Sequence, residues 1–148
     1  MKLLYFASVM LTAIAMAAGF AHLLELPNKM SLARDEYATV QQIYRGWALL
    51  GIPVVAALIC TIALAIGVRR RPPEFPLAMA AALCIALSLA VFFTFTFPAN
   101  RETQNWTVLP DHWQVLRQRW EYSHAVSAAL YFVALSLLTL ALSRGQRN

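Results

Sequence analysis

The sequence contains few charged residues and only two cysteines. Charged residues make up 13% of its 148 positions, about half the share of a soluble domain. Cys60 and Cys84 form no C-x-x-C motif, which argues against a thiol oxidoreductase, and we interpret both as small buried apolar residues. Apolar residues make up 60% of the chain. That share excludes a disordered chain and is more than a soluble fold of this length can bury.

Four apolar runs have the length of membrane spans, which is about 20 residues. Backbone that crosses lipid must be helical, because no water is present to satisfy its polar groups. We therefore predict an all-α fold with one membrane domain over residues 1–148, a four-transmembrane-helix bundle of up-down-up-down topology. The predicted helices are 3–25, 42–68, 76–98 and 118–143, with outer loops at 26–41 and 99–117.

The first run resembles a secretory signal, because Lys2 precedes it and small residues surround Gly19 and Ala21. It is longer than the apolar region of such signals, which is about 7–15 residues. We interpret it as a retained first helix.

The net charge of +5 is concentrated on one side of the predicted membrane. The side with both termini carries six basic residues and the single acidic residue Glu74, whereas the outer side is balanced. The positive-inside rule therefore places both termini in the cytoplasm. We expect an integral membrane protein of the bacterial inner membrane, with its outer loops in the periplasm. The charge is explained by topology, so no nucleic-acid partner is expected.

Two carboxylate–imidazole pairs lie at the outer ends of predicted helices. His22 and Glu25 are three residues apart, as are Glu121 and His124, so each pair shares a helix face. Glu-x-x-His units hold paired iron or manganese in helical bundles, and these side chains also suit zinc or copper. Three interpretations stay open: a transition-metal site, a metal-free catalytic or binding site, and structural ion pairing with outer arginines.

Other outer residues have two interpretations each. Arg45 could hold an anionic or carbonyl group, or extend to the membrane surface. Asn100 could orient a substrate oxygen, although capping of a short helix is the simpler local interpretation. An aromatic belt at the membrane interface is favoured over a stacking pocket for Trp106, Trp113 and Trp120.

Four motifs stand out along the chain: His22-x-x-Glu25-x-Pro27-x-Lys29, Tyr37 with Gln41-Gln42-x-Tyr44-Arg45-Gly46-Trp47, Pro98-x-Asn100 and Arg117-x-Arg119-Trp120-x-x-x-His124. Together they resemble the anthrone oxygenase-like family of small four-helix membrane proteins. The resemblance implies a four-helix bundle and oxidation of an aromatic, quinone-forming substrate by molecular oxygen without added cofactor. It also implies Asn100, Trp120 and His124 as site residues. The His22/Glu25 pair is not a clear feature of the anthrone oxygenases.

We therefore expect an oxygenase-like integral-membrane oxidoreductase acting on a lipophilic aromatic or quinone-type substrate at the outer His/Glu site. An imidazole would act as general base, tuned by a glutamate, and Arg45 would stabilise the developing oxyanion. The expected catalytic residues are His124, Glu121, Asn100, Arg45 and Trp120. The expected ligands of a transition metal (iron, copper, manganese or zinc), if the site holds one rather than none, are His22, Glu25, Glu121 and His124.

The alternative is a non-enzymatic membrane subunit, a small-molecule binder or a transporter component. Alanines four residues apart let membrane helices approach closely and would also suit a homo-oligomer. Such stripes occur at Ala13, Ala17 and Ala21 and at Ala78, Ala82 and Ala86.

Overall fold

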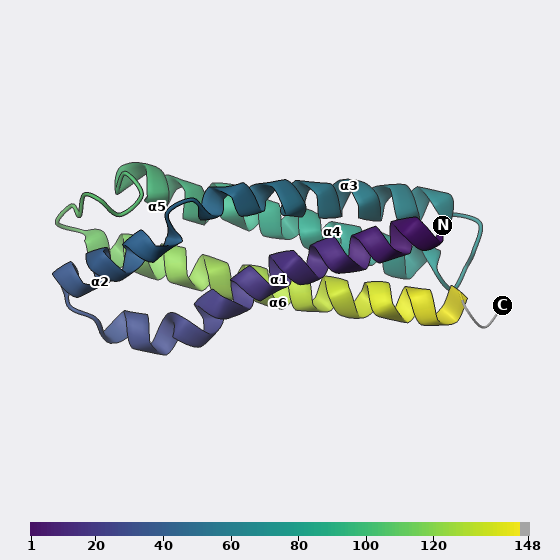
Figure 1. The fold of residues 1–148 in the computed structure, drawn as a ribbon, viewed down its shortest axis with the longest axis horizontal. Coiled ribbons are helices and arrows are strands. Elements are labelled where there is room, and N and C mark those ends of the chain that lie inside the picture. The colour runs from purple at the N-terminus through teal and green to yellow at the C-terminus, as the bar shows by residue number, and fades with distance from the viewer. Residues whose placement is uncertain (146–148) are drawn as a thin grey trace.

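The structure, a computed structural model, describes residues 1–145 of the chain and consists there of helices and connections, without strands. Four helical spans are long and apolar enough to cross a membrane. They are α1 (Lys2–Ser31), η2 with α3 (Trp47–Leu50 and Gly51–Gly67), α4 with η3 and α5 (Phe75–Val91, Phe92–Thr96 and Phe97–Glu102) and α6 (Trp113–Gly145). The spans lie side by side in an elongated bundle (Figure 1). The predicted all-α four-helix bundle is confirmed.

The two ends of the bundle differ. The start of α1, the end of α6 and the turn after α3 lie at one end, which we call the terminal end (Figure 1). The opposite end, which we call the outer end, carries α2 (Arg34–Gln41), η1 (Gln42–Tyr44) and α5. Most of the polar residues singled out by the sequence lie at the outer end.

Each span contacts two others. α1 packs against α6 and α3, and α4 completes the ring by packing against the same two helices. α1 and α6 lie close together at Gly19, where an added Cβ would lie 3.1 Å from Ala128 Cα. A side chain at position 19 would therefore require α6 to shift by a few tenths of an ångström.

The buried face of α1 is not the alanine stripe that the sequence favoured. Ala17 is exposed, and Ala13 and Ala21 are only partly buried. The residues that face the bundle are Tyr5, Ser8, Thr12, Ala15, Gly19, His22 and Lys29. The Ala13–Ala17–Ala21 prediction was wrong because alanine is tolerated on a lipid-facing surface as readily as on a packed one.

α1 continues through Pro27 to Ser31, beyond the predicted end at residue 25. Proline removes one helical hydrogen bond, but membrane helices tolerate it where neighbours satisfy the freed groups. The extra turns carry Lys29 into the bundle. The predicted loop 26–41 is therefore helical for most of its length, first as the end of α1 and then as α2.

Two short 3-10 segments lie between α2 and α3. η1 ends the outer connection, and η2 begins the second span before α3 starts at Gly51. Gly46, which separates them, has a φ of 90°. This left-handed conformation is strained for other residues, so Gly46 sets the turn between the outer connection and the second span.

The third span contains a π-helical turn, η3, directly before Pro98. Proline lacks an N–H and its ring clashes with the carbonyl four residues earlier, and a wider turn accommodates both effects. The following loop includes three residues with positive φ, at Gln104, Asn105 and Trp106. α6 then begins at Trp113, earlier than the predicted residue 118.

Candidate functional site

An ammonium group is buried at the centre of the outer end. Lys29 is 3% exposed, and its Nζ lies 3.0 Å from Glu121 Oε2 and 3.4 Å from Glu25 Oε2. The Glu121 side chain is fully buried, whereas that of Glu25 is 39% exposed. Charges inside a membrane protein are costly unless paired and usually mark function. Lys29 joins α1 to α6 through this pairing.

The remaining donors of Lys29 have partners as well. Nζ donates to Tyr44 Oη at 3.3 Å and lies 3.4 Å from His22 Nδ1. A protonated lysine can only donate, so Nδ1 of His22 is the acceptor in this contact. The ammonium also lies 4.9 Å from the ring centres of Tyr44 and Trp120, within the range of cation–π attraction.

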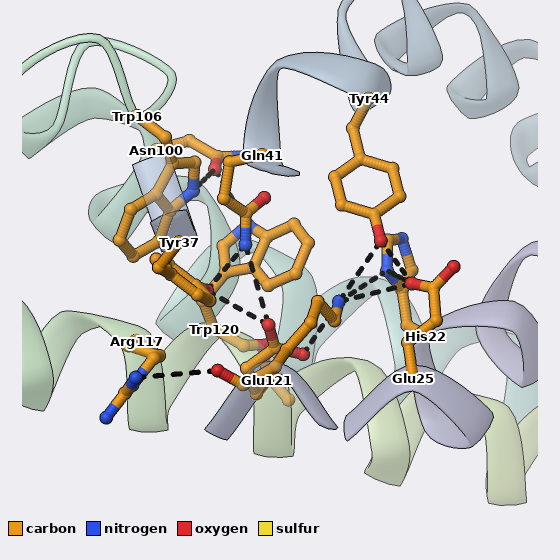
Figure 2. A network of polar contacts seen from close by, with 12 residues as sticks. His22, Glu25, Tyr37, Gln41, Tyr44, Asn100, Trp106, Arg117, Trp120 and Glu121 are labelled. Carbon is orange, nitrogen blue, oxygen red and sulfur yellow. Dashed lines mark hydrogen bonds and ion pairs between the residues drawn. The ribbon is translucent and has the colours of Figure 1, made fainter. Parts of the chain in front are cut away.

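Two residues of α2 satisfy the other oxygen of Glu121 (Figure 2). Tyr37 Oη donates to Glu121 Oε1 at 2.9 Å, and Gln41 Nε2 lies 3.5 Å from the same oxygen. Gln41 Nε2 also donates to Tyr37 Oη at 2.5 Å. The amide oxygen of Gln41 has no hydrogen-bond partner among the described residues although it is buried. We call Lys29 and its surroundings the Lys29 cluster, formed by His22, Glu25, Lys29, Tyr37, Gln41, Tyr44 and Glu121.

The two phenols of the Lys29 cluster stay neutral at ordinary pH. Burial, followed by the charge of Glu121, raises the pKa of Tyr37 well above its usual value. Burial and the hydrogen bond that Tyr44 donates to Glu25 likewise raise the pKa of Tyr44. Both phenols therefore act as hydrogen-bond donors to carboxylates.

The imidazole of His22 contacts that of His124, and the two rings are tilted against each other. Their ring centroids are 4.2 Å apart with an interplanar angle of 35°. The ring of Trp120 lies 4.9 Å from His22 and 4.3 Å from His124. The two carboxylate–imidazole pairs of the sequence thus do converge, as expected from their positions on α1 and α6.

Asn100 holds two of the indole rings in place (Figure 2). Its Oδ1 accepts hydrogen bonds from Trp120 Nε1 at 2.7 Å and from Trp106 Nε1 at 3.2 Å. The helix-capping interpretation of Asn100 was therefore wrong, since its side chain bonds to indoles rather than to the backbone of a following helix.

The aromatic-belt interpretation of the three tryptophans was also wrong. Trp106, Trp113 and Trp120 are each buried in a small apolar core with Tyr37, Ala99 and Leu116. An interfacial belt requires rings at the lipid surface. These rings instead pack against Tyr37 of the Lys29 cluster and against one another.

The arginines do not take the places expected for them. Arg45 is exposed, and its guanidinium donates to Gln42 Oε1 at 3.1 Å rather than to a glutamate or toward the imidazoles. Arg117 donates to the carbonyl of Leu32 at 2.9 Å and lies over the ring of Trp113. The pairing with glutamates is made by Lys29, so the cation that faces the imidazoles is Lys29 rather than Arg45.

The expected metal ligands do not fit a metal ion. Across residues 1–145, no group of three or more His, Cys, Asp or Glu side chains is arranged to hold one. Lys29 Nζ occupies the space between the carboxylates of Glu25 and Glu121 and contacts His22 Nδ1. A metal cation at that point would compete with an ammonium for the same oxygen and nitrogen atoms. We therefore derive no step through a metal.

The sequence interpretation missed the residues that organise the site, namely Lys29, Tyr37, Gln41 and Tyr44. Lys29 follows Glu25 by four residues and His22 by seven, so a helix extending past Pro27 would have placed all three on one face. The predicted first helix stopped at residue 25, before this spacing was complete. Nothing in the spacing of Tyr37 points to Glu121, which lies 84 residues later.

The third histidine lies apart from the Lys29 cluster. His112 is exposed in the outer loop and its Nε2 lies 2.6 Å from Glu102 Oε1, also exposed. His112 therefore provides an exposed control for the imidazoles of His22 and His124.

The chemistry available at the cluster is that of a base beside a fixed cation. An imidazole can accept a proton, and an ammonium in a site of low dielectric stabilises an anion formed nearby.

Compared with known proteins, the chain matches no family model, no curated protein and no solved structure.

Proposed function

We propose that the protein is an oxygenase-like membrane oxidoreductase that oxidises a lipophilic, electron-rich aromatic substrate at the Lys29 cluster. One observation carries this proposal, the buried ammonium of Lys29 beside the imidazoles of His22 and His124. The resemblance to the anthrone oxygenases, seen in the sequence motifs, points to the same class of substrate.

In this proposal His124 is the general base. Lys29 already donates toward Nδ1 of His22, so the second imidazole is the one free to take a proton. Lys29 stabilises the negative charge that develops on the substrate oxygen. The amide oxygen of Gln41, which is buried next to Glu121 and has no partner within residues 1–145, would accept a hydrogen bond from a substrate hydroxyl. Arg45 has no role in the revised site.

The reaction converts an activated ring methylene to a ketone with molecular oxygen as oxidant. His124 removes one methylene proton, and the resulting carbanion gives up electrons to dioxygen as a carbon–oxygen bond forms. The peroxide takes the proton back from the imidazolium. Loss of the second methylene hydrogen with cleavage of the oxygen–oxygen bond then gives the ketone and one water molecule. The two hydrogens lost by the carbon and one oxygen atom of dioxygen account for that water.

The location of the site is part of the proposal. The four apolar spans place the protein in a lipid bilayer, and the basic residues concentrate at the terminal end, which the positive-inside rule assigns to the cytoplasm. The Lys29 cluster would then face the periplasmic side of a bacterial inner membrane, where a lipophilic substrate arrives through the outer leaflet.

The test uses purified protein in lipid nanodiscs with anthrone as probe substrate. Oxygen uptake and anthraquinone formation are followed together, and the spontaneous oxidation in empty nanodiscs is subtracted. We expect catalysis by the wild type, a loss of about 100- to 10,000-fold in His124→Gln and unchanged activity in His112→Gln. Equal rates in wild-type and empty nanodiscs, or equal rates in the two histidine variants, would contradict the proposal for this substrate class.

A second candidate is a non-enzymatic membrane subunit, favoured by the extent of pairing within the cluster. Lys29 has partners for its donors, and Tyr37 and Tyr44 fasten the outer connection to Glu121 and Glu25. Such a network also serves stability alone. In that case the wild type and His124→Gln both show only background oxidation. Lys29→Met then lowers the unfolding temperature and changes nothing else that is measured.

A further inference from the structure

A groove with a basic mouth opens at the terminal end of the bundle, remote from the Lys29 cluster. Its volume is about 530 Å³, and apolar side chains of α1 and α6 form its walls, among them Tyr5, Phe6, Val9 and Leu142. Lys2 and Arg71 line it as well. Along α1, Val9 lies about 10 Å deeper in the bundle than Lys2, at a rise of about 1.5 Å per residue.

A second, polar hollow of about 460 Å³ adjoins the groove. Arg70, Arg71 and Glu74 line it, and it shares Arg71 and Gly145 with the groove. The two hollows together run from a charged surface to an apolar interior, as a phospholipid does from headgroup to acyl chain.

The mouth is built around a buried carboxylate. Glu74 is 2% exposed, and its Oε2 accepts a hydrogen bond from Tyr5 Oη at 2.7 Å. The same oxygen lies 3.4 Å from Arg71 Nη1. Gly145 of α6 packs closely against this carboxylate, since a Cβ added at Gly145 would lie 3.1 Å from Glu74 Cδ. This arrangement holds Arg71 over the groove.

Arg71 keeps binding capacity beyond its contact with Glu74. Its side chain is 51% exposed, and a guanidinium has five donors in a planar fork that suits phosphate. Among the described residues at this end of the bundle, Glu74 is the single acidic one. The basic residues there are Lys2, Arg69, Arg70, Arg71 and Arg144. The charge therefore complements an anionic group.

We propose that this groove binds an anionic phospholipid, with the headgroup phosphate on Arg71 and Lys2 and one acyl chain along Tyr5, Phe6 and Val9. Basic pockets between membrane helices bind such headgroups in general. This inference is independent of the proposed oxidation, because no residue of the Lys29 cluster takes part in it.

Native mass spectrometry of the protein from nanodiscs of equimolar phosphatidylglycerol and phosphatidylcholine tests the proposal. We expect the wild type to retain phosphatidylglycerol in preference. Lys2→Gln and Arg71→Gln should each weaken that retention about fivefold, the effect of one basic residue near a headgroup. Arg119→Gln removes one exposed positive charge at the outer end and should leave retention unchanged.

A groove-filling variant separates a defined site from general charge attraction. Val9→Trp keeps every basic residue but occupies the apolar part of the groove, so retention of phosphatidylglycerol should fall. Should that variant not fold, as judged by circular dichroism, Lys2→Gln decides the matter, since Lys2 is exposed. Equal retention of both lipids by the wild type, or an effect of Arg119→Gln equal to that of Lys2→Gln, overturns the proposal.

Discussion

Lys29 Nζ of α1 and Glu121 Oε2 of α6 form an ion pair at 3.0 Å in which both side chains are buried. Removal of one partner from a buried pair leaves the other charge uncompensated, which costs about 3–5 kcal/mol. We expect Lys29→Met and Glu121→Gln each to lower the free energy of unfolding by a large part of that amount. The double variant should lose less than the sum of the two.

Unfolding in mixed micelles of increasing denaturing detergent measures these changes. The control is Arg119→Met, which removes an exposed charge from the same part of α6. An additive double variant would show that the two side chains are not coupled.

The close contact of Gly19 with Ala128 gives a second prediction. A larger side chain at Gly19 must displace the backbone of α6, because its Cβ would lie 3.1 Å from Ala128 Cα. We expect Gly19→Val to destabilise the bundle by about 1–3 kcal/mol. Gly51→Ala is the control, since nothing lies within 4 Å of an added Cβ there, and it should not destabilise. Thermal unfolding of the two variants in one detergent compares them.

The raised pKa values of Tyr37 and Tyr44 predict loss of stability in alkali. A group whose pKa is raised by folding stabilises the folded state below its unfolded pKa, about 10 for tyrosine. This contribution falls as the pH rises above that value toward the folded pKa. We therefore expect the unfolding temperature to decrease above about pH 10.

Ultraviolet titration of tyrosinate identifies the groups involved. Tyr37→Phe should leave the folded-state titration curve unchanged below the alkaline transition. If the wild type shows a tyrosinate signal below the alkaline transition that is absent from Tyr37→Phe, the assigned burial of Tyr37 is contradicted.

The double acceptor role of Asn100 gives a fourth prediction. Asn100→Ala deprives the indoles of Trp106 and Trp120 of their hydrogen-bond acceptor, and each unsatisfied buried donor costs about 1–3 kcal/mol. We expect reduced stability and a shifted tryptophan emission. Gln114→Ala alters an exposed residue at the start of α6 and should change neither property. Unaltered emission in Asn100→Ala would exclude the role.

The spans were predictable because length and apolar content decide them. The convergence of His22 and His124 also followed from the sequence, since antiparallel neighbours bring both helix ends to one face. Lys29 was not predicted as a site residue, because the apolar run that defined the first helix ended before it. The positions of Trp106 and Tyr37 depend on long-range packing between the two outer connections, for which residue spacing carries no signal.

The interpretation of Asn100 shows the limit of local rules. An asparagine after a helix end is a plausible cap in isolation, and only the presence of two indoles in space makes it an acceptor. The same holds for Arg45, which we expected to stabilise an oxyanion but whose side chain bonds to Gln42.

The fastening of α2 to Glu121 has a consequence for how the chain is assembled in a membrane. Tyr37 lies 84 residues before its carboxylate partner, and Lys29 also depends on that carboxylate, which belongs to the last span. The first two spans therefore enter the bilayer with an ammonium that lacks one of its counterions. The outer connection reaches its final conformation only after the fourth span has been synthesised and inserted.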